Sequence, residues 1–302
     1  QVLGAVARAL RGEASGATDA VIVAVRLPRV LLAAVVGACL AAAGLLYQAL
    51  FRNPLADPYI LGVSSGAGLG VTVVLVLTAG ATGMRVGAVP LGAFAGAAAT
   101  IVLVSRLATR RGRVEPTSLL LAGVAVSYTL AALTSFLMVV ARESMASVVF
   151  WMMGGLEGAT WGYVAWVVGM LAVGGTVALL AARRLNLVLL GEERAGQLGL
   201  PVERFKALVL AVASLLTAAA VSVSGLIGFV GLMTPHGVRL VLGPDHRRLL
   251  PASMLAGAVA MVLADLASRT VLAPTELPVG IVTALLGGPF FVWLLVRGGR
   301  GR

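Results

Sequence analysis

Few side chains in this chain of 302 residues could carry out chemistry. It has 12 acidic residues, 2 histidines, 1 cysteine and a single lysine among its 23 basic residues. A phosphate-binding loop needs glycine-rich backbone amides followed by a lysine that reaches the phosphates. The lysine, Lys206, lies in "ERFKALV", which has no such glycines. The chain is therefore not predicted to hydrolyse ATP by that route.

The chain also has few residues that could bind a metal or act as catalytic nucleophiles. We interpret His236, in "TPHGVRL", as a polar helix-packing residue and His246, in "GPDHRRL", as a solvated loop residue. Metal or haem ligation is the less favoured alternative for both histidines. Cys39 lies within a hydrophobic run, where a small buried side chain is the expected role. No grouping of Ser, His and acid indicates a triad, so we predict no catalytic residue, no metal site and no cofactor in this chain.

One polar stretch, "LLGEERAGQLGLPVERFK" at residues 189–206, holds three of the acidic residues and the lysine. Its first part predicts a short helix, because Glu192 and Glu193 suit the positive N-terminal end and Gly199 can adopt a left-handed cap. Pro201 favours the first turn of a second helix. Two helices joined in this way would form a rigid protrusion that could dock on a soluble partner. The alternative is a solvated connecting loop.

The elements that position these residues are predicted to be membrane helices. The composition, 60% hydrophobic and 12% charged, and the mean hydropathy of +1.03 exceed those of soluble domains. The apolar residues come in runs of about 20, the length that crosses a bilayer. We predict an all-α, polytopic membrane bundle forming one domain over residues 1–302. The nine predicted spans are 31–50, 59–79, 87–107, 118–141, 163–182, 206–224, 226–242, 252–268 and 279–296.

The basic residues predict the orientation, because cytoplasmic loops retain them. Sixteen of the 23 lie on the side of the connections that follow odd-numbered spans, and seven lie on the other side. The stretch at 189–206 and the C-terminus are therefore predicted to be cytoplasmic, and residue 1 to be outside. We interpret the net charge of +11 as topology and contact with anionic lipid, in preference to nucleic-acid binding.

The start of the sequence and its glycines add two expectations. The chain begins at Gln1, and residues 1–16 are too polar to span a membrane and do not fit a signal peptide. We therefore expect a further helix, absent from this sequence, before the first span.

Many of the 38 glycines lie inside the spans, as in "SSGAGLG", "GAFAG" and "GLIGFVG". Small residues of this kind predict close helix packing, and bent helices where backbone lines a cavity.

Five ordered stretches resemble the FecCD-type permeases, the membrane subunits of ATP-binding-cassette importers for vitamin B12, haem and iron-siderophore complexes. They are "RLPRVLLAAVVGACLAAAGLLYQALFRNPLADPYILGVSSGAGLG", "FWMMGGLEGATW", "LGEERAGQLGLP", "GLIGFVGLMTPHGVRLVLGPDHRRLLP" and "ELPVGIVTALLGGPFFVWLL". The resemblance covers nearly the whole chain. The family has ten helices per subunit, one more than we predict here.

The resemblance implies that residues 186–205 contain the cytoplasmic coupling element that docks on an ATPase subunit. Its implied coupling residues are Leu190, Gly191, Glu192, Glu193, Arg194, Ala195, Gln197, Leu198, Gly199, Leu200 and Pro201. ATP and Mg²⁺ would then be held by that partner.

The resemblance also assigns residues outside the membrane and at the pore. Arg26, Arg29 and Arg269 match arginines that receive glutamates of a periplasmic or lipid-anchored substrate-binding protein. The alternative for Arg269 is an ion pair with Asp265, four residues earlier on the same helix.

Asn53, Pro54 and Leu55 match the cytoplasmic gate, where Leu55 would close the pore by apolar contact with its dimer mate. The alternative is a tight turn between helices, which Pro54 and Pro58 would define.

The function predicted on this basis is a dimeric permease, not an enzyme. It would import a bulky metal chelate or corrinoid (cobalamin, haem or a ferric siderophore) across a bacterial or archaeal cytoplasmic membrane. Its partners would be a second permease subunit, making a homodimer, two ATPase subunits, the binding protein and membrane lipid. The alternative, an ion-coupled secondary transporter, would need acidic or histidine residues deep in several spans, which the sequence does not supply.

Overall fold

The computed structural model describes residues 17–78, 85–110 and 113–298. The helical elements are α2 (Ala17–Val21), the π-helical turn η1 (Ile22–Arg26), α3 (Leu27–Leu50), α4 (Val63–Leu77), α5 (Arg85–Ala108), α6 (Pro116–Val140), the 3₁₀ turn η3 (Arg142–Ser144), α7 (Met145–Met152), α8 (Trp161–Leu189), α9 (Glu192–Gln197), α10 (Val202–Ser224), α11 (Val230–Leu242), α12 (His246–Thr270) and α13 (Val279–Gly298). The strands β1 (Thr109–Arg110) and β2 (Arg113–Val114) pair antiparallel between α5 and α6.

Each of the nine predicted spans corresponds to a helix within the described residues, which confirms the all-α membrane bundle. Six of the described helices are long and apolar enough to cross a membrane. Two shorter apolar helices cover Val63–Leu77 and Val279–Val292.

Several predicted boundaries differ from the structure, and two of these differences are informative. The first predicted span began at residue 31, whereas α2, η1 and α3 continue from Ala17 to Leu50. The seventh began at residue 226, whereas α11 begins at Val230. Gly225 (φ +64°) and Phe229 (φ +67°) adopt positive φ angles, so residues 225–229 cannot extend either helix. The helix α7 was not predicted, because eight residues are too few to give a membrane-span signal.

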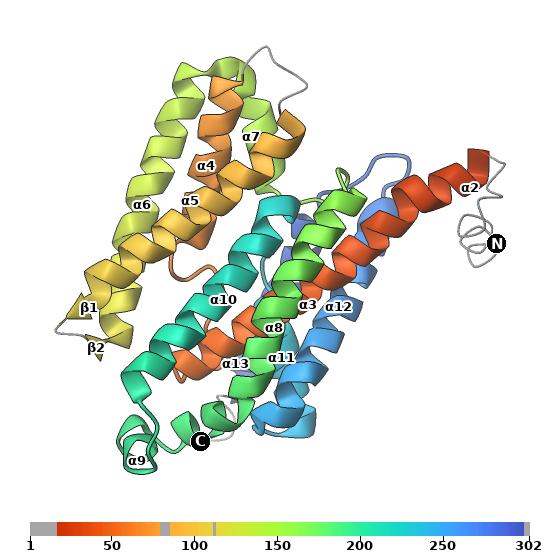
Figure 1. Cartoon of the computed structure of the whole chain (residues 1–302). Helices are drawn as coiled ribbons and strands as arrows, with labels where there is room; N and C mark the ends of the chain where they lie inside the picture. The colour runs from red at the N-terminus through yellow and green to blue at the C-terminus, as the bar shows by residue number, and fades with distance from the viewer. Residues whose placement is uncertain (1–16, 79–84, 111–112, 299–302) are drawn as a thin grey trace.

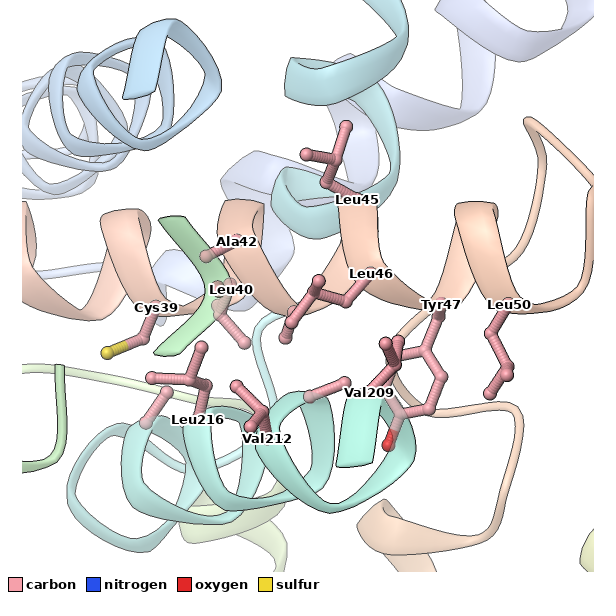
Figure 2. Close-up of a cluster of buried hydrophobic side chains, with 14 of the residues drawn as sticks. Cys39, Leu40, Ala42, Leu45, Leu46, Tyr47, Leu50, Val209, Val212 and Leu216 are labelled. Carbon is pink, nitrogen blue, oxygen red and sulfur yellow. The ribbon is translucent and has the colours of Figure 1, made fainter. Parts of the chain in front are cut away.

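Helix α3 lies at the centre of one group of helices and contacts α8, α10, α11 and α12 (Figure 1). Its apolar side chains are buried along most of its length. Figure 2 shows Leu46, Tyr47 and Leu50 facing Val209 and Val212 of α10. The Tyr47 hydroxyl is satisfied in this core by the Ser214 hydroxyl at 2.8 Å. The core therefore joins α3 to α10, the helix that follows the predicted coupling element.

Helices α4, α5, α6 and α7 form a second group beside α10 (Figure 1). Its buried core is built from Leu75 and from small and β-branched side chains of α4, α5 and α7, with Ala218 and Val221 of α10. Helix α10 thus packs against both groups, so a displacement of α10 would change its contacts with each group.

Glycines bring α3 close to two neighbouring helices. A Cβ atom at Gly44 would overlap the backbone oxygen of Gly231 in α11, and one at Gly37 would overlap that of Gly257 in α12. In lipid, such small residues let helix backbones approach closely. The glycine-based prediction of close packing is therefore confirmed at these contacts.

Candidate functional site

The stretch between α8 and α10 forms the predicted short helix and turn. Helix α9 spans Glu192–Gln197, and Gly199 has a φ of +84°. The Leu200 N–H donates to the Ala195 carbonyl at 3.1 Å, which closes the C-terminal turn of α9. Because α8 extends to Leu189 and α10 begins at Val202, the connection is residues 190–201, shorter than the predicted 186–205.

This connection has a buried side and an exposed side. Ala195 is fully buried and Leu200 is 7% exposed, which anchors the turn to the bundle core. Leu198 is 61% exposed and Leu190 53% exposed. The other exposed residues on this segment are Glu193, Arg194, Gly196, Gln197, Gly199 and Pro201. A face of apolar and charged side chains on a short rigid helix can bind another protein.

Lys206 fixes this connection to α10, a role that the sequence analysis missed. Its Nζ lies 3.0 Å from Glu192 Oε2 and 2.9 Å from Glu203 Oε1, and its side chain is 5% exposed. Glu192 is the first residue of α9, so the ion pair joins α9 directly to α10. The spacing of Glu203 and Lys206 along one helix could have indicated half of this cluster.

At the opposite end of the bundle, Arg29 is enclosed by carboxylates. Its Nε donates to Asp265 Oδ1 at 2.9 Å and its Nη1 to Glu276 Oε2 at 2.8 Å. Arg29 and Asp265 are buried, whereas the Glu276 side chain is 38% exposed. Two ion pairs therefore connect α3 to α12 and to the link between α12 and α13.

Arg269 joins the same cluster through Asp265 Oδ2, at 3.1 Å from its Nη2. The ion pair between residues four apart on one helix, given above as the alternative for Arg269, is therefore present. Arg26 is exposed on η1, one turn before Arg29. The structure thus brings Arg29 and Arg269 together on one carboxylate and leaves Arg26 at the surface.

The link between α3 and α4 contains the predicted gate residues in a defined turn. Asn53 Oδ1 accepts a hydrogen bond from the Leu55 N–H at 2.9 Å, and the Asn53 N–H donates to the Gln48 carbonyl at 3.1 Å. Asn53, Pro54 and Leu55 are exposed, with Leu55 at 39%. The turn predicted as the alternative is present, and it displays Leu55 outward.

Further along this link, Tyr59 is bonded to the irregular segment between α10 and α11. Its hydroxyl donates to the Ile227 carbonyl and accepts from the Ile227 N–H, both at 3.1 Å. Asp57 Oδ1 accepts the Tyr59 N–H at 2.8 Å. Burial raises the pKa of Asp57 from its ordinary 3.8 to about 6, although the bond from Tyr59 opposes that rise.

The structure agrees with the predicted role of His236 but not with that of His246. His246 is 2% exposed and begins α12, so its prediction as a solvated loop residue is wrong. Its Nδ1 lies 2.9 Å from Asn186 Oδ1, and its backbone N–H donates to the same oxygen. His236 packs edge-on against Phe290 with ring centroids 6.5 Å apart, as expected of a helix-packing residue. No group of three His, Cys, Asp or Glu in the described residues could hold a metal ion.

Comparison with known proteins places this arrangement in a family. The chain matches the FecCD transport family over residues 2–297. It is 49% identical to the cobalamin import system permease protein BtuC of Halobacterium salinarum, over 90% of this chain and 72% of that protein. It is 42% identical to the hemin transport system permease protein HmuU of Yersinia pestis, over 90% and 82%.

A solved structure shares the same fold. It is described as an inward-facing conformation of a metal-chelate type ABC transporter, and it superposes with a TM-score of 0.85 at 35% identity. The match covers 92% of this chain and 88% of that one. The chain belongs to the FecCD transport family and is a multi-pass membrane protein.

Proposed function

We propose that this chain is the permease subunit of an ATP-binding-cassette importer for a bulky metal chelate or corrinoid. The observation that carries the proposal is the protruding segment at 190–201, in a chain whose relatives are importer permeases. ATP and Mg²⁺ would be bound by a separate ATPase, and this chain would form the pathway as a homodimer. The segment and the C-terminus would face the cytoplasm of a bacterial or archaeal cell.

In this proposal, the exposed face of residues 190–201 docks on the ATPase. Leu190 and Leu198 supply apolar contact, while Glu193 and Arg194 supply charge that fixes the register. The ion pair between Lys206 and Glu192 supports transmission of ATPase motion to α10. It joins Glu192, the first residue of α9, to Lys206 of α10. The core shared by α3 and α10 would carry the motion into the bundle.

Docking of a binding protein is proposed for the opposite end. Arg26 is exposed and could steer acidic side chains of the partner during encounter. Arg29 and Arg269 already pair with Asp265 and Glu276, so a partner carboxylate would have to share or exchange these contacts. Glu276 is the most exposed of the four and the one most readily displaced.

A cytoplasmic gate at Asn53, Pro54 and Leu55 completes the proposal. The Asn53 turn holds Leu55 outward, where it could meet the same residue of the dimer mate. Bonds from Tyr59 to Ile227 would couple this gate to the start of α11.

An ion-coupled secondary transporter is less well supported. Such a protein needs ionisable residues in its spans that can gain and lose an ion. Asp265 is buried in α12, but Arg29 and Arg269 both pair with it. It is therefore held as a structural carboxylate.

The proposal can be tested by co-purification with the ATPase and binding protein encoded beside it. The full-length chain should retain the ATPase, and Leu198→Glu should lose it, because a charge would enter an apolar contact. Leu272→Glu is the matched control, since Leu272 is 55% exposed at the other end of the bundle. Uptake of cobalamin, haem and a ferric siderophore into proteoliposomes would then identify the substrate. Equal ATPase retention by both variants, or none by the wild type, would overturn the docking role of this segment.

A further inference from the structure

A cavity of about 360 Å³ lies among the ends of four helices, beside the link between α3 and α4. Gln48 of α3, Arg52 of the link, Leu189 of α8, Arg239 of α11 and His246 of α12 contribute to its wall. None of its eight described lining residues is acidic. Arg29 and Arg269, at the other end of the bundle, lie within 3.1 Å of carboxylates, whereas Arg52 and Arg239 line this cavity with no acidic residue beside them in its wall.

The arginines of this cavity are held in position by the surrounding fold. Gln48, which is 3% exposed, accepts a bond from Arg239 Nη2 at 2.9 Å and donates to the Leu232 carbonyl at 3.2 Å. That bond uses one of the five N–H donors of the guanidinium. Arg52 adopts a φ of +49° because it follows the C-cap residue of α3 in a Schellman cap, in which the Asn53 N–H donates to the Gln48 carbonyl at 3.1 Å.

Exposed apolar side chains lie on two of the helices that line the cavity. Leu240, Val241 and Leu242, which follow Arg239 on α11, are 66%, 82% and 46% exposed, and Leu189 is 43% exposed. The cavity therefore offers cations for an anionic group, and its wall includes the exposed apolar side chain of Leu189. It also lies at the ends of membrane-spanning helices, the level at which lipid headgroups reside.

We propose that this cavity binds the phosphate of an anionic phospholipid, with Arg239 and Arg52 as its cationic ligands. The guanidinium fork suits two phosphate oxygens, and the exposed end of α11 would contact the acyl chains. Inorganic phosphate offers the same oxygens without the acyl chains. The inference depends on the membrane placement of the chain and not on its transport role.

The test uses the full-length chain in nanodiscs of equal phosphatidylglycerol and phosphatidylcholine, with bound lipid read by native mass spectrometry. Wild-type protein should retain phosphatidylglycerol preferentially. Arg52→Gln with Arg239→Gln should lower that retention about 10-fold or more, because two charge-assisted contacts are lost. Arg183→Gln with Arg184→Gln removes the same charge from exposed residues of α8 and should retain the lipid.

Three further outcomes decide the proposal. Arg52→Gln alone changes an exposed residue outside the helices, so partial loss with unchanged folding would support direct binding. Displacement of phosphatidylglycerol by millimolar inorganic phosphate would support a phosphate site that does not need the acyl chains. No preference in the wild type, or equal loss in the two double variants, would overturn the proposal.

Discussion

Individual charged residues in this protein are held by carboxylate or amide partners from distant parts of the chain. The bond from Arg29 to Glu276 joins residues 247 positions apart. No local pattern could predict it, because it depends on how α3 and the link before α13 meet in space. The pair between Asp265 and Arg269 follows helical spacing and was readable from the sequence. The residue types at the candidate site were therefore predictable, whereas most of their partners were not.

Asp265→Asn should destabilise the bundle strongly. The change leaves buried Arg29 with only the exposed Glu276 as a full charge partner, and breaking a buried pair costs about 3 kcal/mol or more. We expect a lower apparent Tm in detergent. Glu276→Gln, which removes the exposed partner, should cost less than half as much. Equal Tm values for Asp265→Asn and the wild type would contradict the described cluster.

The raised pKa of Asp57 predicts a pH-dependent stability. Since folding raises this pKa from 3.8 to about 6, the folded state favours the protonated carboxyl. The contribution of Asp57 to stability is fully present below about pH 4 and is lost as the pH rises through about 6. Asp57→Asn keeps an oxygen for the Tyr59 N–H and removes the charge. The variant should therefore unfold at a higher temperature than the wild type at pH 8, and the difference should shrink towards pH 4.

Infrared spectroscopy gives an independent check on this carboxyl. A protonated carboxyl band should titrate with a midpoint near pH 6 in the wild type and be absent from Asp57→Asn. A pH-independent difference in unfolding temperature, together with no such band, would contradict the raised pKa of Asp57.

At the scale of elements, the hydrophobic runs predicted the helices but not the breaks between them. Runs of about 20 apolar residues encode length, whereas the break at 225–229 depends on backbone angles at Gly225 and Phe229. Phenylalanine has no preference for a positive φ, so the residue type at position 229 did not predict a helix break. The connection at 190–201 was predictable because its glycine and proline favour a definite cap and start.

Close helix contact makes Gly44 sensitive to a single methyl group. Gly44→Ala would push α3 away from the Gly231 backbone and should cost about 1–3 kcal/mol in unfolding free energy. Gly68→Ala in α4 is the control, because no atom lies within 4 Å of its added Cβ. That change should be neutral or slightly stabilising, since alanine favours helices. Similar unfolding free energies for the two variants would mean that α3 and α11 do not meet at Gly44.

At the scale of the whole molecule, the two ends of the bundle carry different surfaces. One end presents α9 and the link between α3 and α4, and the other presents α2 and the link between α12 and α13 (Figure 1). Helices α3 and α10 run between these ends and share one core. In the proposed importer, these two helices would connect the end that docks on the ATPase with the end that docks on the binding protein.

We propose that transport through this chain is driven by ATP on a partner subunit. The most direct measurement is substrate uptake into proteoliposomes, with and without the ATPase, under either ATP or an imposed proton or sodium gradient. Uptake is expected only when the ATPase and ATP are both present, with no response to either gradient. Uptake driven by an ion gradient in liposomes that lack the ATPase would contradict the proposal and favour a secondary transporter.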